Sequence, residues 1–195
     1  MGMPAAMDRP WTADEVRALP IEPGKRFEVV DGELLVTPAP SRRHQHVVLE
    51  LAVLLRSLVH ASPVGTVLIA PSDYDLDEHT LVQPDLYVLP ASATEVIRGS
   101  AESVAAILFV EVLSPSTARH DRVVKRLRYQ RAGIEYWLVD SDARVFERWM
   151  PGAQRPDVID EQFTWQPPGI AAPTTVDVAE FFDQALGPAA GIDGR

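Results

Sequence analysis

Apolar residues are spaced along the chain in two ways, which predict helices and strands. In residues 44–60 they recur every three or four positions, as expected for a helix that buries one wide face. Residues 118–132 predict a second long helix, which ends at Gly133. Residues 104–113 and 135–139 are almost continuously apolar and predict strands that are buried on both faces of a sheet.

Turn and capping residues mark the shorter elements. Thr12 and Glu15 have the spacing of a capping box and predict a short N-terminal helix. The pair Asp31-Gly32 favours a two-residue turn and predicts a hairpin around it. A final helix begins at Asp177, and residues 151–173 carry only marginal strand patterns. The remaining predicted strands are 26–30, 33–37, 64–70, 81–89 and 144–149.

This order of elements predicts an α/β fold with a single mixed sheet flanked by helices. The chain has 195 residues, which suffices for one domain with its own core. We expect an N-terminal arm and short helix in residues 1–20, one domain in residues 21–186 and a frayed tail in residues 187–195.

Composition excludes several classes of site. The chain has no cysteine, so disulfides, thiolate zinc sites, iron–sulfur clusters and a cysteine nucleophile are excluded. No apolar run approaches the roughly 20 residues of a membrane span, and no leader pattern is present, so we expect a cytoplasmic protein without membrane contact. The net charge of −10 repels polyanions at long range, which argues against a nucleic-acid coat over the whole surface.

Two acids that stand alone in apolar segments are the first candidates for metal-binding residues. Asp85 is the only charged residue in 81–89, and Glu111 is the only one in 106–113. A buried carboxylate is costly unless a cation or a cluster of donors meets it. If the two strands lie side by side, the carboxylates come together and favour a shared divalent ion such as Mg²⁺. The alternative is that each acid reaches water at a strand end or caps a neighbouring backbone.

The helix that follows Glu111 carries a basic face. Arg119, Arg122, Lys125 and Arg126 share this face at about 100° per residue, and it could hold phosphates. A solvated surface that compensates an acidic protein is the alternative. Lys125 is one of only two lysines, and lysine, unlike arginine, can be tuned by burial to position or deprotonate a water.

The order and spacing of several segments resemble the Uma-two family of restriction-endonuclease-like proteins, within the PD-(D/E)XK nuclease superfamily. The resemblance spans about residues 27–149 and implies a mixed central sheet flanked by helices, with an N-terminal helix and hairpin. It also implies a magnesium-dependent phosphodiesterase site in which Mn²⁺ can substitute. The segments that carry it are 27–34, 37–41 with His44, 83–85, 110–117, Asp121 with Lys125 and Tyr129, and 133–140.

Individual roles follow from this resemblance. Asp85 would be the acid of the "PD" pair and Glu111 the second acid. The superfamily's lysine normally lies two residues after the second acid, where this chain has Leu113; in this branch it moves to the next helix, which makes it Lys125. Glu28 would add a metal ligand, directly or through water.

Three functions are compatible with these residues. The leading hypothesis is Mg²⁺-dependent hydrolysis of DNA, with Asp85, Glu111 and Glu28 at the metal and Lys125 at the attacking water. A catalytically inactive nucleic-acid-binding module and a hydrolase of small phosphate esters are the alternatives.

By analogy with nucleases that cut both strands, we expect a homodimer. The residues expected to contact phosphate are Arg119, Arg122, Arg126 and His44.

Overall fold

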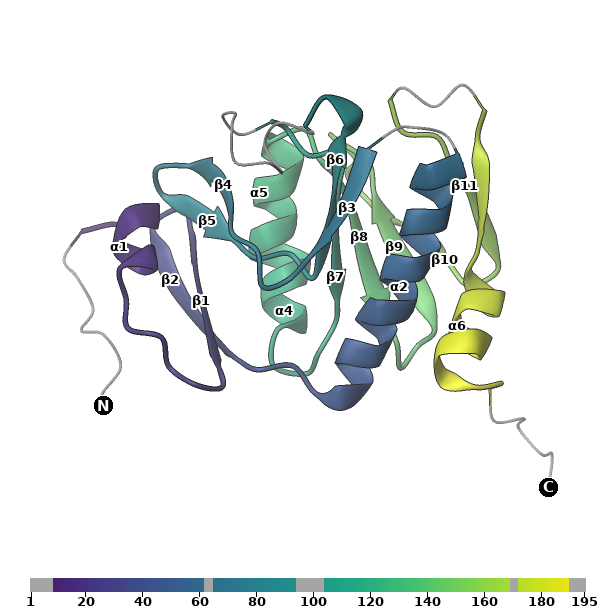
Figure 1. Cartoon of the computed structure of the whole chain (residues 1–195), viewed down its shortest axis with the longest axis horizontal. Helices are drawn as coiled ribbons and strands as arrows, with labels where there is room; N and C mark the ends of the chain where they lie inside the picture. The colour runs from purple at the N-terminus through teal and green to yellow at the C-terminus, as the bar shows by residue number, and fades with distance from the viewer. Residues whose placement is uncertain (1–8, 62–64, 94–103, 169–171, 190–195) are drawn as a thin grey trace.

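A six-stranded sheet, the large sheet, forms the centre of the molecule (Figure 1). The computed structural model describes residues 9–61, 65–93, 104–168 and 172–189. Neighbouring strands run antiparallel except for the parallel pair β7 and β8, so the large sheet is mixed, as predicted. In spatial order its strands are β10 (Asp157–Ile159), β9 (Val145–Trp149), β8 (Glu135–Asp140), β7 (Leu108–Val112), β6 (Leu86–Pro90) and β3 (Gly65–Ile69).

A second sheet of four antiparallel strands, the small sheet, lies beside the large one, so the prediction that all the strands share a single sheet is wrong. Its order is β2 (Glu33–Pro38), β1 (Lys25–Val30), β5 (Thr80–Val82) and β4 (Tyr74–Asp77). The turn between β1 and β2 is the predicted Asp31-Gly32 pair, whose φ angles of 49° and 83° are both positive.

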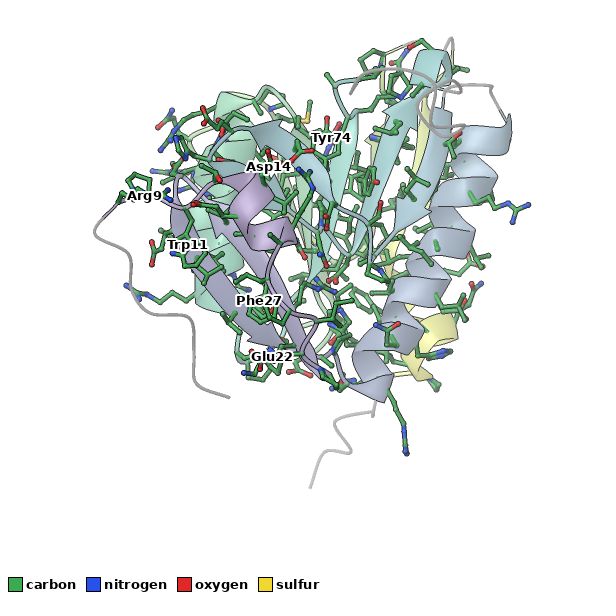
Figure 2. The ribbon with its side chains drawn as sticks, turned by 60° about the vertical axis from the view of Figure 1, so that its left-hand side comes forward. Arg9, Trp11, Asp14, Glu22, Phe27 and Tyr74 are labelled. Atoms are coloured by element: carbon green, nitrogen blue, oxygen red, sulfur yellow. The ribbon has the colours of Figure 1, made fainter. Side chains whose placement is uncertain are left out.

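The N-terminal helix α1 (Ala13–Arg17) covers the outer side of the small sheet (Figure 2). Its predicted capping box is present: Thr12 Oγ1 accepts from the Glu15 N–H at 3.3 Å, and the Glu15 carboxylate accepts from the Thr12 N–H at 3.0 Å. Val16 packs with Val29 and Leu81 beneath the helix. The arm expected in residues 1–20 therefore packs on the domain from α1 onward, while residues 1–8 lie outside the described segments.

Two of the strand predictions are wrong in detail. Residues 81–89 were expected to form one strand, but they divide between β5 in the small sheet and β6 in the large sheet. Pro84 explains the break, because it has no N–H to donate to a ladder. The strand expected over 104–113 shortens to β7, because its partner β8 starts only after Gly133, whose φ of 72° does not fit a strand.

Helices cover both faces of the large sheet. α2 (Arg42–Ala61) and α6 (Val178–Leu186) lie on one face, together with a ribbon of β11 (Gln162–Trp165) and β12 (Thr174–Asp177) (Figure 1). The region after residue 150, where the sequence carries only marginal strand patterns, therefore contains short strands. Alternation along β11 buries Phe163 and Trp165. No helix in the described segments has the length and apolarity needed to cross a bilayer.

The opposite face is covered by the small sheet and by one continuous helical stretch, the site helix. The site helix consists of α4 (Ala118–His120), a wider turn η2 (Asp121–Lys125) and α5 (Arg126–Arg131). It crosses between the parallel strands β7 and β8, and Tyr129 packs edge-to-face on Phe109 and Tyr136 with ring centroids 4.6 and 4.9 Å apart. After β6, a single tight turn η1 (Ala91–Ala93) ends the described segment.

Candidate active site

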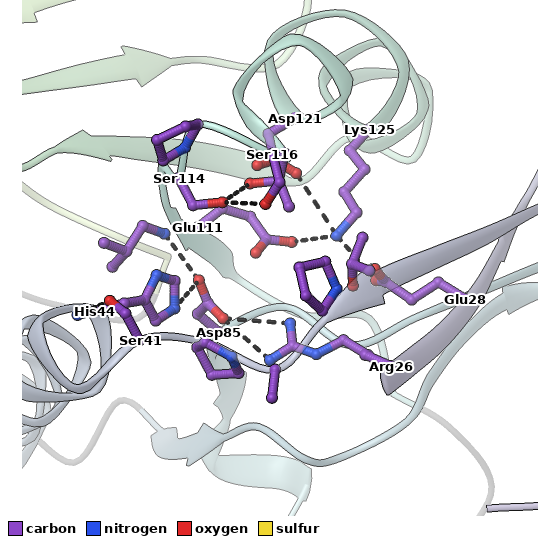
Figure 3. Close-up of a pocket in the computed structure, with 17 residues that line it drawn as sticks. Arg26, Glu28, Ser41, His44, Asp85, Glu111, Ser114, Ser116, Asp121 and Lys125 are labelled. Atoms are coloured by element: carbon purple, nitrogen blue, oxygen red, sulfur yellow. Dashed lines mark hydrogen bonds and ion pairs between the residues drawn. The ribbon is translucent and has the colours of Figure 1, made fainter. Parts of the chain in front are cut away.

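A pocket of about 230 Å³, the acid pocket, opens between the two sheets (Figure 3). Its walls come from β1, the loop between β2 and α2, the first turn of α2, the end of β7 and the start of the site helix. Alternation along β7 turns Glu111 to the same face as Phe109, toward the site helix. The acid pocket brings together five of the residues predicted from the sequence: Glu28, His44, Asp85, Glu111 and Lys125.

Asp85 lies at the break between the two sheets, directly after Pro84, and is only 3% exposed. Its Oδ1 accepts hydrogen bonds from Arg26 at 3.3 and 3.4 Å, and its Oδ2 accepts from the Val112 N–H at 3.0 Å. His44 Nε2 lies 3.1 Å from Oδ2. Burial alone would raise the pKa of Asp85, but His44, Arg26 and the Val112 amide outweigh it and hold the pKa below its ordinary value.

Glu111 meets the ammonium of Lys125, and both side chains are almost fully buried. Lys125 Nζ donates to Glu111 Oε1 at 2.8 Å. The same nitrogen lies 2.9 Å from Glu28 Oε1 and 3.7 Å from Asp121 Oδ1. Glu28 also accepts the Gln83 N–H at 2.8 Å. One ammonium therefore lies at the centre of three carboxyl groups.

The pKa shifts reflect this imbalance of charge. Burial would lower the pKa of Lys125, but attraction to Glu111 and Glu28 raises it well above the ordinary value. Burial raises the pKa of Glu111 well above its usual range, and Lys125 offsets this only in part. The pKa of Asp121 is also raised by burial despite the neighbouring Lys125. Three acids share one cation, and their burial and mutual repulsion oppose full ionisation of the cluster, which a further cation in the pocket would relieve.

The wider turn in the site helix places Asp121 in this cluster. The N–H of Arg126 donates to the carbonyl of Asp121, five residues earlier, as in a π-type turn. Asp121, Lys125 and Tyr129, which follow one another at intervals of four residues, are all buried. The sequence prediction named Asp121 with Lys125 and Tyr129 among the segments that resemble the family but gave it no role in the site, although the successive spacings of four along a helix indicated a shared face.

Arg26 is the second site residue that the sequence prediction missed. It contacts Asp85 and lines the acid pocket from β1. It lies two residues before Glu28 on that strand, so alternation places both on one face and could have identified it.

The three arginines predicted to bind phosphate lie outside the lining of the acid pocket. Arg122 forms ion pairs with Asp140 at 2.9 Å and Glu147 at 2.6 Å. Arg126 stacks over the Trp149 ring, with its guanidinium carbon 4.5 Å from the ring centroid. Arg119 is exposed and has no polar partner in the described segments. Their role as phosphate contacts stays a prediction.

The donor set of the pocket suits a magnesium ion held by two carboxylates. Within the described residues, no three acidic or histidine side chains are placed to bind one ion together. Glu28 instead contacts Lys125 and the Gln83 amide. Asp85, directly before β6, and Glu111, on the neighbouring β7, line the same pocket, and Mg²⁺ commonly uses one or two carboxylates with water and phosphate oxygens.

Comparison with known proteins fits this geometry. A family model described as "Putative restriction endonuclease" matches residues 13–182. The chain belongs to the Uma2 family. It is also similar to the crystal structure of "a putative nuclease belonging to DUF820" from Anabaena variabilis ATCC 29413, with a TM-score of 0.71 and 21% identity over 91% of this chain and 100% of that chain. That likeness shows a shared fold. A comparison with curated proteins gave no match.

In this Uma2 chain Lys125 reaches Glu111 from the site helix. Leu113, at the position where the superfamily normally has its lysine, is half-buried and packs against the aromatic cluster beside β7. Lys125 Nζ nevertheless lies 2.8 Å from Glu111. The structure therefore places an ammonium beside the second acid, and its part in catalysis stays a prediction.

Proposed function

We propose that the protein is a magnesium-dependent nuclease that hydrolyses phosphodiester bonds in DNA. The observation that carries this proposal is the meeting of Asp85, Glu111 and Lys125 in one pocket. Membership of the Uma2 family, with its restriction-endonuclease description, supports the same conclusion.

Five residues of the acid pocket have a role in this reaction. Asp85 and Glu111 would hold Mg²⁺, which when bound neutralises phosphate charge and makes water a better nucleophile. Lys125 holds a proton at Nζ and orients the attacking water beside Glu111. Arg26 and His44 offer N–H groups to the phosphate oxygens from the Asp85 side. The water oxygen bonds to phosphorus, one P–O ester bond breaks, and a proton passes to the departing alcohol oxygen.

An inactive nucleic-acid-binding module is the second candidate. It is favoured by the fact that nitrogen groups already lie beside both acids: Arg26 and His44 beside Asp85, and Lys125 beside Glu111. A module of this kind would retain the pocket as a structural ion-pair cluster. It would bind DNA with an affinity that falls as salt rises.

Cleavage assays separate the two candidates. We expect labelled DNA to be cut with Mg²⁺ or Mn²⁺ and left intact with EDTA, and Glu111→Gln to lose about 10²-fold or more in rate. Glu161→Gln is the matched control, because it makes the same change at an exposed side chain that lies outside the lining of the acid pocket. Calorimetry should show Mg²⁺ binding that Asp85→Asn abolishes. If no DNA form is cleaved and Asp85→Asn leaves Mg²⁺ binding unchanged, the nuclease proposal is wrong.

A further inference from the structure

Free positive charge is scarce in the described segments of the chain. Most arginines in the described segments are bound to carboxylates, as Arg122 and Arg128 are. A protein that grips a duplex along its backbone commonly makes about 6–10 phosphate contacts through lysine and arginine. This chain carries a net charge of −10. Across residues 9–61, 65–93, 104–168 and 172–189, the arginines without a polar partner are Arg42, Arg56, Arg119 and Arg155.

Two of these free arginines flank the acid pocket in the sequence. Arg42 follows Ser41 at the start of α2, and Arg119 lies two residues after Thr117 at the start of the site helix. Both Ser41 and Thr117 line the pocket. The free arginines of the described segments can therefore contact only a small number of phosphates close to the pocket, fewer than a duplex footprint needs.

The depth of the acid pocket also argues against a duplex as the substrate. Asp85 and Glu111 are each 3% exposed, and Lys125 is 4% exposed. A phosphate must enter a space of about 230 Å³ to reach them. The backbone of a duplex is held on the outside of a wide, stiff helix, whereas a single strand can bend one phosphate inward and turn its bases aside.

A second hollow, the side hollow, adjoins the acid pocket across Arg26. It has a volume of about 520 Å³, and the two spaces share Arg26, Ala39 and Pro40 as walls. Much of the rest of its lining is apolar, including Leu19 and Phe27, the latter visible on β1 in Figure 2. Ile21 stands at this hollow with 96% of its surface exposed. An open apolar surface beside a charged pocket offers the face of a base something to pack on.

We infer that the substrate is single-stranded DNA, which places one phosphate in the acid pocket and an adjoining base in the side hollow beside Ile21. Arg26 lies between the two spaces and contacts the phosphate that links them. This inference rests on the proposed nuclease function and adds the form of its substrate.

The test compares one labelled oligonucleotide as a single strand and as a duplex, with Mg²⁺ present. We expect kcat/KM to be at least about tenfold higher for the single strand, and Ile21→Asp to raise KM about tenfold with kcat unchanged. The matched control is Val158→Asp, on strand β10 at the far edge of the large sheet, where the side chain is 63% exposed. This variant should behave as wild type.

The outcomes distinguish this inference from the nuclease proposal. If the duplex is cut as fast as the single strand, or Ile21→Asp acts like the Val158→Asp control, the inference is overturned while the nuclease proposal stands. If neither DNA form is cut, fluorescence anisotropy with the same oligonucleotides decides. Tighter binding of the single strand that Ile21→Asp weakens supports the inference, and equal or tighter binding of the duplex overturns it.

Discussion

Replacing Lys125 by Met tests the charge cluster directly. The change removes the ammonium and keeps a side chain of similar length. Glu28 and Glu111, which lie 2.9 and 2.8 Å from Nζ, would then lose their shared cation in a buried site, and Asp121 would lose its neighbour at 3.7 Å. Removing one partner of a buried ion pair costs about 3–5 kcal/mol. Because the total stability of a domain is about 5–15 kcal/mol, this loss is large and still measurable.

Urea unfolding followed by circular dichroism measures the loss, with EDTA present so that no metal replaces the ammonium. We expect Lys125→Met to lower the midpoint with an unchanged slope, which identifies a change in stability. The control Lys25→Met removes an ammonium whose side chain is 36% exposed and paired with Glu22, so it should change stability by less than about 1 kcal/mol.

A double-mutant cycle with Glu111→Gln then isolates the contact. Neutralising Glu111 removes part of the repulsion that Lys125→Met creates. The double variant should therefore be more stable than the sum of the single losses predicts, by about 0.5–3 kcal/mol. Additive losses, or a Lys125→Met variant within 1 kcal/mol of wild type, would refute the buried cluster as described.

Other predictions concern the sheets and the first helix. Gly65→Ala should lower Tm by several degrees, because its Cβ would meet the Leu89 carbonyl oxygen across β3 and β6; an unchanged Tm would contradict that pairing. Thr12→Ala should cost about 1 kcal/mol at pH 7 in urea titrations. Hydrogen bonds from Arg9 and the Thr12 N–H lower the pKa of Glu15 from 4.5 to about 2. The stability that Glu15 adds is therefore present above pH 4.5 and lost as pH falls toward 2; in Glu15→Gln this pH dependence should disappear.

The fold was predictable where local chemistry determines it. The capping box of α1, the Asp31-Gly32 turn and the stop at Gly133 depend on neighbouring residues alone, and the structure contains all three. The prediction of one strand over residues 81–89 failed because the apolar pattern continues across Pro84, whereas the backbone hydrogen bonds of a strand do not. The assignment of a strand to one sheet or another depends on partners distant in sequence, which the pattern does not contain.

The residues of the candidate site were likewise predictable only in part. Asp85 and Glu111 were found because each is the only charge in an apolar stretch, and a buried charge is costly unless a partner compensates it. Lys125 was found by its rarity and by family resemblance. Arg26 and Asp121 were missed because they lie in ordinary polar surroundings in the sequence and become buried partners only after the two sheets and the site helix pack together.

The acid pocket lies on the seam between two separately hydrogen-bonded sheets, and this location has a mechanical consequence. β1 supplies Arg26 and Glu28, whereas β7 supplies Glu111 from the other side of the seam. If one sheet slid slightly against the other, the ion pair between Arg26 and Asp85 would separate while the ion pair between Lys125 and Glu111 remained. The arrangement of charges in the pocket thus depends on how the two sheets fit together.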